Sequence, residues 1–335
     1  MSQITGLYKE ELSRNGLLLK ECEKDSFEQN LTTEYESMLK DLSKQVTEKD
    51  LKIRIYWIEN DSVNATVVKI QDTYCIGLFS GITTSLIDHI NHYYRDGINE
   101  FDGLELPTIS AFYNVTESST NEGKLGNYIF TMSFLYLVMH EFGHIICGHC
   151  EKENDIAVLF EEMRNEGGNY FKQAKECVAD FYGVINSYDY FLPSCLGHLG
   201  DIGLITTLYI TSVHTIFWIF AFNKDSIHDT NHSKLTHPHP VIRMTYFFIL
   251  IENELRNMLE IFERQKKIYL LVDNPAEKIV DAAIEDFFNI LSRTDVDFNA
   301  DDTLSELCDK ELKRIDKSVE EVKEFYKEAS YVRYV

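Results

Sequence analysis

One apolar segment that runs directly into a pair of histidines constrains this chain more than any other feature. Residues 129–139 are almost uninterruptedly apolar, contain no proline and lead into His140-Glu141-Phe-Gly-His144. On a helix, His140 and His144 stand four residues apart on one face, so both imidazoles can hold one metal ion. Glu141 projects toward the same site, where it can accept a proton from a water molecule. The segment therefore predicts a buried helix that carries a metal site.

A metal site of this kind needs a third protein ligand. The metzincin arrangement places glycine three residues and histidine six residues after the second histidine, but here these positions are Cys147 and Cys150. The other solution is a carboxylate on a later helix, and Glu176 and Asp180 lie four residues apart in an apolar segment. We predict Glu176 as the ligand and Asp180 as the acceptor of a ligand histidine's second N–H group. The glutamates within 161–166 are rival ligands that lack apolar surroundings.

The order of these motifs resembles that of a known peptidase group. HEFGHIICGH at 140–149 followed by ECVADFYG at 176–183 is similar to the gluzincin peptidases of the HtpX and CaaX-prenyl-protease type. The H-P-x-x-x-x-R element at 237–243 and the Asn-Ala hairpin over 63–82 extend this resemblance. The phage-exclusion peptidase Lit and its relatives are a second, soluble group with the same motif. The resemblance implies a zincin-like fold with one Zn²⁺ per chain.

The same resemblance implies roles for residues outside the two ligand helices. His237 would donate the hydrogen bond that stabilises the oxyanion, and Arg243 would anchor that loop or a nearby acidic residue. His239 is an extra histidine that the pattern does not require, and it stays open as an alternative. An edge strand near the metal would pair with the substrate backbone, unless that strand only packs in the core. The residues expected to serve this strand are Asn64, Tyr74, Ile76 and Leu78.

Short strand-like segments precede the metal helix. Residues 52–58, 63–70 and 74–80 are rich in β-branched and aromatic residues, and three polar residues separate the last two segments. They predict a small antiparallel sheet with a hairpin, in which 74–80 is the edge strand. Residues 95–127 are polar and rich in turn-forming residues, so they predict a long loop before the metal helix.

The rest of the chain has apolar residues at helical spacing, both before the sheet and from Val241 to the end. We therefore predict the α+β class: a mainly helical zincin-like metallopeptidase domain with a small sheet, flanked by helical segments at both ends. The predicted boundaries are 1–50 for the N-terminal helical cap, 51–250 for the catalytic domain and 251–335 for the C-terminal helical segment.

The amino-acid composition limits which binding partners and which cellular compartment we expect for this protein. The chain has 32 basic and 55 acidic residues and a net charge of −23. A surface this acidic repels phosphate backbones, so we expect no nucleic-acid partner. The seven cysteines are scattered and odd in number, which argues against a disulfide framework and favours the reduced cytoplasm. Gly203 to Phe222 has the length of a membrane span, but His214 and several threonines favour a buried core helix, with membrane association as the alternative.

Together these observations predict a zinc-dependent endopeptidase that hydrolyses peptide bonds of a protein or peptide substrate. Two alternatives stay open: a latent Lit-like protease of a phage-defence or stress system that needs a trigger, and a non-catalytic zinc-binding regulatory module. The intact Glu141 argues against the second alternative, because a protein that only binds zinc has no need of a general base.

Overall fold

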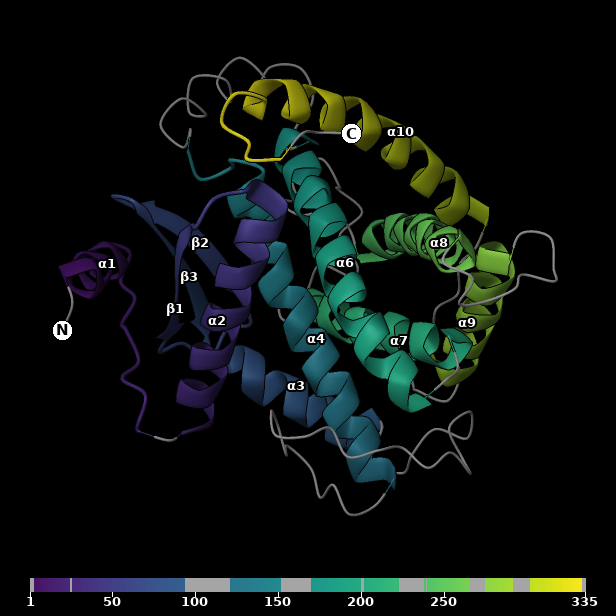
Figure 1. Cartoon of the computed structure of the whole chain (residues 1–335), viewed down its shortest axis with the longest axis horizontal. Helices are drawn as coiled ribbons and strands as arrows, with labels where there is room; N and C mark the ends of the chain where they lie inside the picture. The colour runs from purple at the N-terminus through teal and green to yellow at the C-terminus, as the bar shows by residue number, and fades with distance from the viewer. Residues whose placement is uncertain are drawn as a thin grey trace.

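The computed structural model describes residues 3–24, 26–93, 121–151, 170–199, 202–222, 238, 240–264, 275–291 and 302–332, and these are mainly helical with one small sheet (Figure 1). The elements, in chain order, are α1 (Gln3–Arg14), α2 (Phe27–Thr47), β1 (Lys52–Ile58), β2 (Ala65–Ile70), β3 (Thr73–Phe79), α3 (Ser80–Tyr93), α4 (Asn121–Ile146), α6 (Tyr170–Leu199), α7 (Ile202–Phe222), α8 (Pro240–Arg264), α9 (Pro275–Leu291) and α10 (Asp302–Tyr326). The predicted α+β class is confirmed.

The sheet has the order β1-β3-β2, and this order corrects the predicted antiparallel arrangement. β2 and β3 form the predicted antiparallel hairpin, but β1 runs parallel to β3. The link between β1 and β2, residues 59–64, must therefore pass across the end of β3. Six residues can reach roughly 20 Å, and two strand spacings amount to only about 10 Å. The link is therefore long enough to join either neighbouring or next-but-one strands, and its length does not predict which strands pair.

The predicted edge strand is also wrong. β3 lies in the centre of the sheet and all of its residues are buried, so Tyr74, Ile76 and Leu78 cannot pair with an added strand. β3 is buried because both faces of the sheet are covered: Tyr8 and Leu12 of α1 pack on one face, and the main core packs on the other. In Figure 1, α1 lies on the outer side of the sheet, and α2 and α4 lie on its inner side. The edge strand next to α4 is β2.

Helix α4 is the central helix of the protein. It begins at Asn121, so the last seven residues of the predicted loop over 95–127 are helical. The rest of that loop lies outside the described residues. From Leu125 to Ile146 almost every α4 side chain is buried, because α6, α7, α3 and the sheet surround the helix. An all-round apolar helix of this kind can only be stable in a core or in a membrane.

Two glycines allow α4 and α6 to approach closely. A Cβ atom added to Gly143 would lie 2.7 Å from the backbone oxygen of Ala179, and one added to Gly183 would lie 3.1 Å from the Cα atom of His140. These contacts place the backbone of the His140–His144 segment directly against the Glu176–Asp180 segment. The close approach lets short carboxylate side chains reach the histidines.

We expect Gly143→Ala to lower the free energy of unfolding by about 1–3 kcal/mol, since the new methyl group meets backbone atoms that cannot move aside. Urea unfolding followed by circular dichroism measures this change. Gly6→Ala is the matched control, because Gly6 is helical and has no atom within 4 Å of the added Cβ. That substitution should stabilise the protein by about 0.5–1 kcal/mol. Equal effects of the two substitutions would contradict the close packing of α4 against α6.

Helix α7, which contains the predicted membrane-span candidate, lies in the core. Its buried residues include Ile205, Leu208, Tyr209 and Val213, and even His214 is only 4% exposed. Ser133 of α4 donates a hydrogen bond from its hydroxyl to the backbone oxygen of Ser212, at 2.8 Å. Within the described part of the chain one helix, Lys124–Ile146, is long and apolar enough to cross a membrane, and 94% of its apolar window is buried inside the protein.

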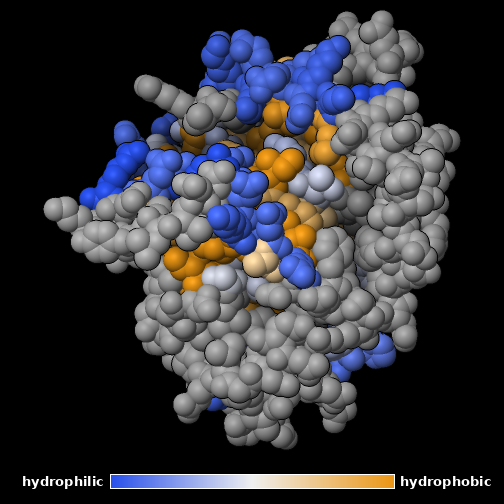
Figure 2. All heavy atoms as spheres, turned by 90° about the vertical axis from the view of Figure 1, so that its right-hand side faces the viewer, coloured by the Kyte–Doolittle hydropathy of each residue, from blue (hydrophilic) through white to orange (hydrophobic). Residues whose placement is uncertain are grey.

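Helix α10 packs across α6 and ends beside α4. Its buried face carries Ile315, Val319, Val322 and Tyr326, which recur at helical spacing. Figure 2 shows hydrophilic side chains gathered along the top of the molecule, where α10 lies, with hydrophobic side chains beneath them. The segment after α10 then turns back, and the backbone N–H of Tyr331 donates to the backbone oxygen of Ile146 at 2.8 Å.

Candidate metal centre

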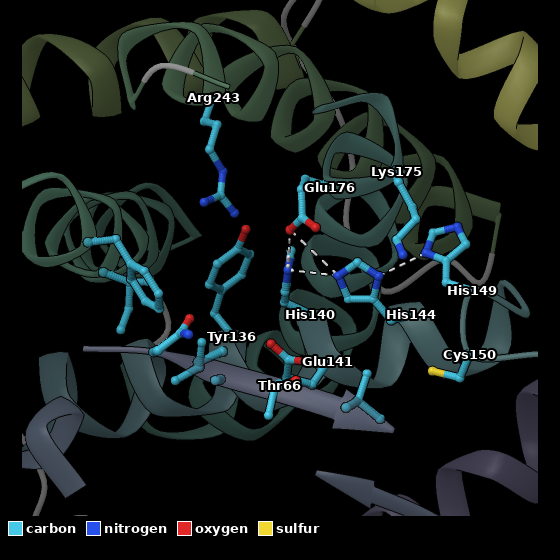
Figure 3. A pocket seen from close by; sticks show the side chains of 16 residues that line it. Thr66, Tyr136, His140, Glu141, His144, His149, Cys150, Lys175, Glu176 and Arg243 are labelled. Carbon is cyan, nitrogen blue, oxygen red and sulfur yellow. Dashed lines mark hydrogen bonds and ion pairs between the residues drawn. The ribbon is translucent and has the colours of Figure 1, made fainter. Parts of the chain in front are cut away.

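The structure brings the three predicted ligands together. His140 and His144 come from one face of α4, and Glu176 reaches them from α6 (Figure 3). His140 Nε2 lies 3.3 Å from His144 Nε2 and 3.3 Å from Glu176 Oε2, and His144 Nε2 lies 3.6 Å from the same oxygen. One ligand atom from each residue lies within 4.8 Å of the others. Two imidazole nitrogens and one carboxylate oxygen fit a Zn²⁺ ion that keeps one coordination position open.

Asp180 lies beside the first histidine, where the sequence predicted an acceptor. Its Oδ1 atom lies 2.8 Å from His140 Nδ1, on the opposite side of the ring from Nε2, which faces the other two candidate ligands. Arg243 of α8 holds the same carboxylate: Nε donates to Oδ2 at 2.9 Å and Nη2 donates to Oδ1 at 2.5 Å. The Tyr136 hydroxyl also donates to Oδ1, at 2.6 Å. Arg243 therefore anchors an acidic residue, which is one of the two roles that the sequence predicted for it.

The electrostatic environment favours a bound cation. Burial alone would lower the pKa of His140, but Asp180 and Glu176 outweigh it and raise this pKa to about 10. Burial would raise the pKa of Asp180, but Arg243 and His140 hold it well below its usual range. The carboxylates thus attract positive charge to the His140 imidazole, and a metal ion can take the place of the proton there.

Glu141 is a buried carboxyl group beside the candidate ligands. Its side chain is 5% exposed and lines the same cavity as the three ligand candidates (Figure 3). Burial raises its pKa to about 7, with nearby Glu176 contributing to the shift. A carboxyl group with a pKa near neutrality can accept a proton and then release it at physiological pH.

His149 is a site residue that sequence reasoning missed. Its Nδ1 atom lies 2.8 Å from His144 Nδ1, and its side chain is buried with 1% exposed. On a continuous helix, a residue five positions after His144 would point away from it. The helix instead ends at Ile146, and Gly148 with φ of 74° turns the chain back. Glycine at this position is the signal that could have predicted the turn. Burial lowers the pKa of His149 well below its usual value, so the imidazole is neutral.

The three candidate ligands line a cavity of about 270 Å³. One wall is formed by Asn64 and the first residues of β2, which include Thr66. Apolar side chains of α7 form another wall, and Lys175 lines the cavity beside Glu176. The cavity therefore joins the candidate metal site to the edge of the sheet.

The remaining predicted site residues have different outcomes. Asn64 lines the cavity, whereas Tyr74, Ile76 and Leu78 belong to the central strand and do not. His237, its alternative His239, and the rival glutamates 161, 162 and 166 lie outside the described residues. Their roles stay predictions.

In comparisons with known proteins, no family model, no curated protein and no solved structure matches this chain. The resemblance to gluzincin peptidases therefore rests on the short motifs and on the buried His140-His144-Glu176 group, which is consistent with an HExxH-plus-glutamate zinc site.

Proposed function

We propose that this protein is a zinc-dependent endopeptidase that hydrolyses peptide bonds of a protein or peptide substrate. The observation that carries this proposal is the convergence of His140, His144 and Glu176 within 4.8 Å, with Glu141 lining the same cavity. A site that only stored zinc would have no use for a buried carboxyl group beside the ligands.

When bound, the zinc ion would supply a positive charge that polarises both the attacking water and the scissile carbonyl. Glu141 would accept the proton from that water and deliver it to the leaving amine. His140 and His144 would hold the metal through Nε2, because these two atoms face each other and Glu176 Oε2. Asp180 would keep the His140 ring in the orientation that presents Nε2. His237 stays the candidate donor to the oxyanion.

Strand β2 is the proposed binding edge for the substrate backbone. β2 pairs with β3 on one side only, and no strand covers its other side among the described residues. Residues 64–67, at its start, line the cavity beside the metal ligands. An extended peptide could pair with this edge by main-chain hydrogen bonds, which would place a backbone carbonyl near Glu141. This assignment replaces the predicted edge over 74–80.

Metal content of the purified protein tests the site. We expect one zinc per chain in the wild type by elemental analysis, and its loss in Glu176→Ala, which removes one of the three ligands. Glu285→Ala is the control, because Glu285 is an exposed glutamate on α9. It should retain zinc as the wild type does.

The other outcomes of this test are equally informative. Zinc retained in Glu176→Ala would show that another residue, such as one of the glutamates within 161–166, is the third ligand. A wild type that binds no zinc after reconstitution would refute the metal centre.

We place this activity in the cytoplasm, on the basis of the cysteine usage discussed above; none of the five cysteines for which the structure describes the side chain forms a disulfide. Cleavage of a fluorogenic peptide library by the zinc-loaded protein tests the activity itself. Zinc bound without hydrolysis until a partner protein is added would instead favour the latent protease.

A further inference from the structure

His149 contacts the candidate ligand His144 on the side of the ring that faces away from the metal site. The two Nδ1 atoms lie 2.8 Å apart, and His149 is not one of the three residues that could hold the ion (Figure 3). His140 has Asp180 in the equivalent position. The two ligand histidines thus have different partners: one is a carboxylate and the other is an imidazole.

The contact fixes the hydrogen positions of both rings. A neutral imidazole that binds a metal through Nε2 carries its hydrogen on Nδ1. His144 Nδ1 must then donate, so His149 Nδ1 must accept and His149 carries its own hydrogen on Nε2. His149 Nε2 has no hydrogen-bond partner among the described residues. If the His149 ring turned over, its Cδ2–H group would replace Nδ1 opposite the His144 N–H, and the hydrogen bond would be lost.

The C-terminal segment prevents the His149 ring from turning. The Tyr326 ring packs against it with a centroid separation of 4.8 Å. The backbone of Ala329 lies so close to Gly148 that an added Cβ atom would be 2.6 Å from its carbonyl carbon. The Ser330 hydroxyl and the Tyr331 N–H both donate to the backbone oxygen of Ile146, at 3.2 Å and 2.8 Å. These contacts hold the turn that places His149 behind His144.

A partly buried polar cluster ties this segment to the sheet. The Tyr331 and Tyr74 hydroxyls lie 2.5 Å apart, and both contact the carboxylate of Glu151, which also pairs with Lys69 at 2.5 Å. Glu151 lies two residues after His149. The sheet, the C-terminal segment and the turn after α4 are therefore joined at one point.

We propose that His149 is a positioning residue for His144, and that residues Tyr326 to Tyr331 hold His149 in the orientation in which its Nδ1 accepts from His144. The proposal rests on the metal centre described under the proposed function. It assigns a role to the chain's C-terminal end that the motifs do not suggest.

Zinc affinity, measured by competition with a chromophoric chelator, tests the role of His149. We expect His149→Leu, which removes the acceptor, to weaken zinc binding about 10- to 100-fold. His149→Asn is the matched variant, because its side-chain oxygen can accept where Nδ1 does, and it should stay within about threefold of the wild type. The visible spectrum of bound Co²⁺ should change in His149→Leu and be restored in His149→Asn, which a merely structural role would not produce.

The C-terminal part of the proposal has its own pair of variants. Tyr326→Leu removes the ring that packs on His149, so it should weaken zinc binding severalfold. Phe325→Leu is the control, because Phe325 lies in the same turn of α10 and packs on Phe171 and Tyr326, whereas it is the Tyr326 ring that packs on His149. Unfolding of each metal-free variant by urea shows whether the fold is intact.

The outcomes separate this proposal from the metal centre itself. A wild type without zinc refutes the metal centre. A wild type that binds zinc, with His149→Leu binding equally well or His149→Asn binding as weakly as His149→Leu, overturns only the role of His149. Equal zinc affinities of Tyr326→Leu and Phe325→Leu overturn the role of the C-terminal segment.

Discussion

Glu141→Gln should retain one zinc per chain and lose about 10²- to 10⁴-fold of the peptide-hydrolysis rate, the usual contribution of a general acid–base group. The amide has nearly the shape of the carboxyl group, and Glu141 is not one of the three candidate ligands, so the metal site should stay intact. An amide cannot accept the proton of the attacking water. The rate is measured on a peptide cleaved by the wild type, and the zinc content by elemental analysis.

Glu285→Gln is the control for this experiment, since it makes the same chemical change at an exposed position. It should hydrolyse the peptide at the wild-type rate. Full hydrolysis by Glu141→Gln would show that Glu141 is not the base. Zinc loss in Glu141→Gln would show that the carboxylate supports the metal rather than the chemistry.

Arg243→Met should lower the free energy of unfolding by about 3–5 kcal/mol, because it leaves the Asp180 carboxylate buried without its cation. Asp180 is 4% exposed, and Arg243 is its bidentate partner. The guanidinium also lies 4.3 Å from the centre of the Phe217 ring, so the substitution loses that contact as well. Urea unfolding of the metal-free protein measures the change without any contribution from zinc binding.

Arg256→Met is the matched control, because Arg256 lies on the same helix in an exposed ion pair with Glu252. It should change the free energy of unfolding by less than about 1 kcal/mol. The double variant Asp180→Asn/Arg243→Met removes both charges and should regain part of the stability lost in Arg243→Met. Equal losses in Arg243→Met and Arg256→Met would be incompatible with a buried, energetically coupled pair.

The sequence predicted the candidate metal site because the positions of its residues follow from local geometry. Residues four apart on a helix share a face whatever surrounds the helix, so His140 with His144 and Glu176 with Asp180 could be paired from spacing alone. The apolar run before His140 indicated that the site would be buried, and the structure places His140, Glu141 and His144 at 5–7% exposed. The same local reasoning located the three strands and most helices.

Contacts between distant segments could not be predicted from spacing. The order β1-β3-β2 depends on how a six-residue link crosses the sheet, so the edge strand was assigned to β3 instead of β2. This link packs closely on Gly81 of α3, where an added Cβ atom would lie against the backbone of residues 61 and 62. Residues of α1 pack on one face of the sheet and the main core packs on the other, so β3 is buried throughout and has no alternation from which its position could be read.

By itself, then, the sequence determined that two helices carry a His-His-Glu group with a glutamate beside it, because helical periodicity is a property of the local chain. Only the tertiary structure decided which groups hold the candidate ligands in place from the side that faces away from the site. Arg243 reaches Asp180 across 63 residues of sequence, and Tyr326 reaches His149 across 177. These partners are selected by the packing of whole helices, in which a glycine turn at Gly148 and close contacts at Gly143 matter as much as the motif.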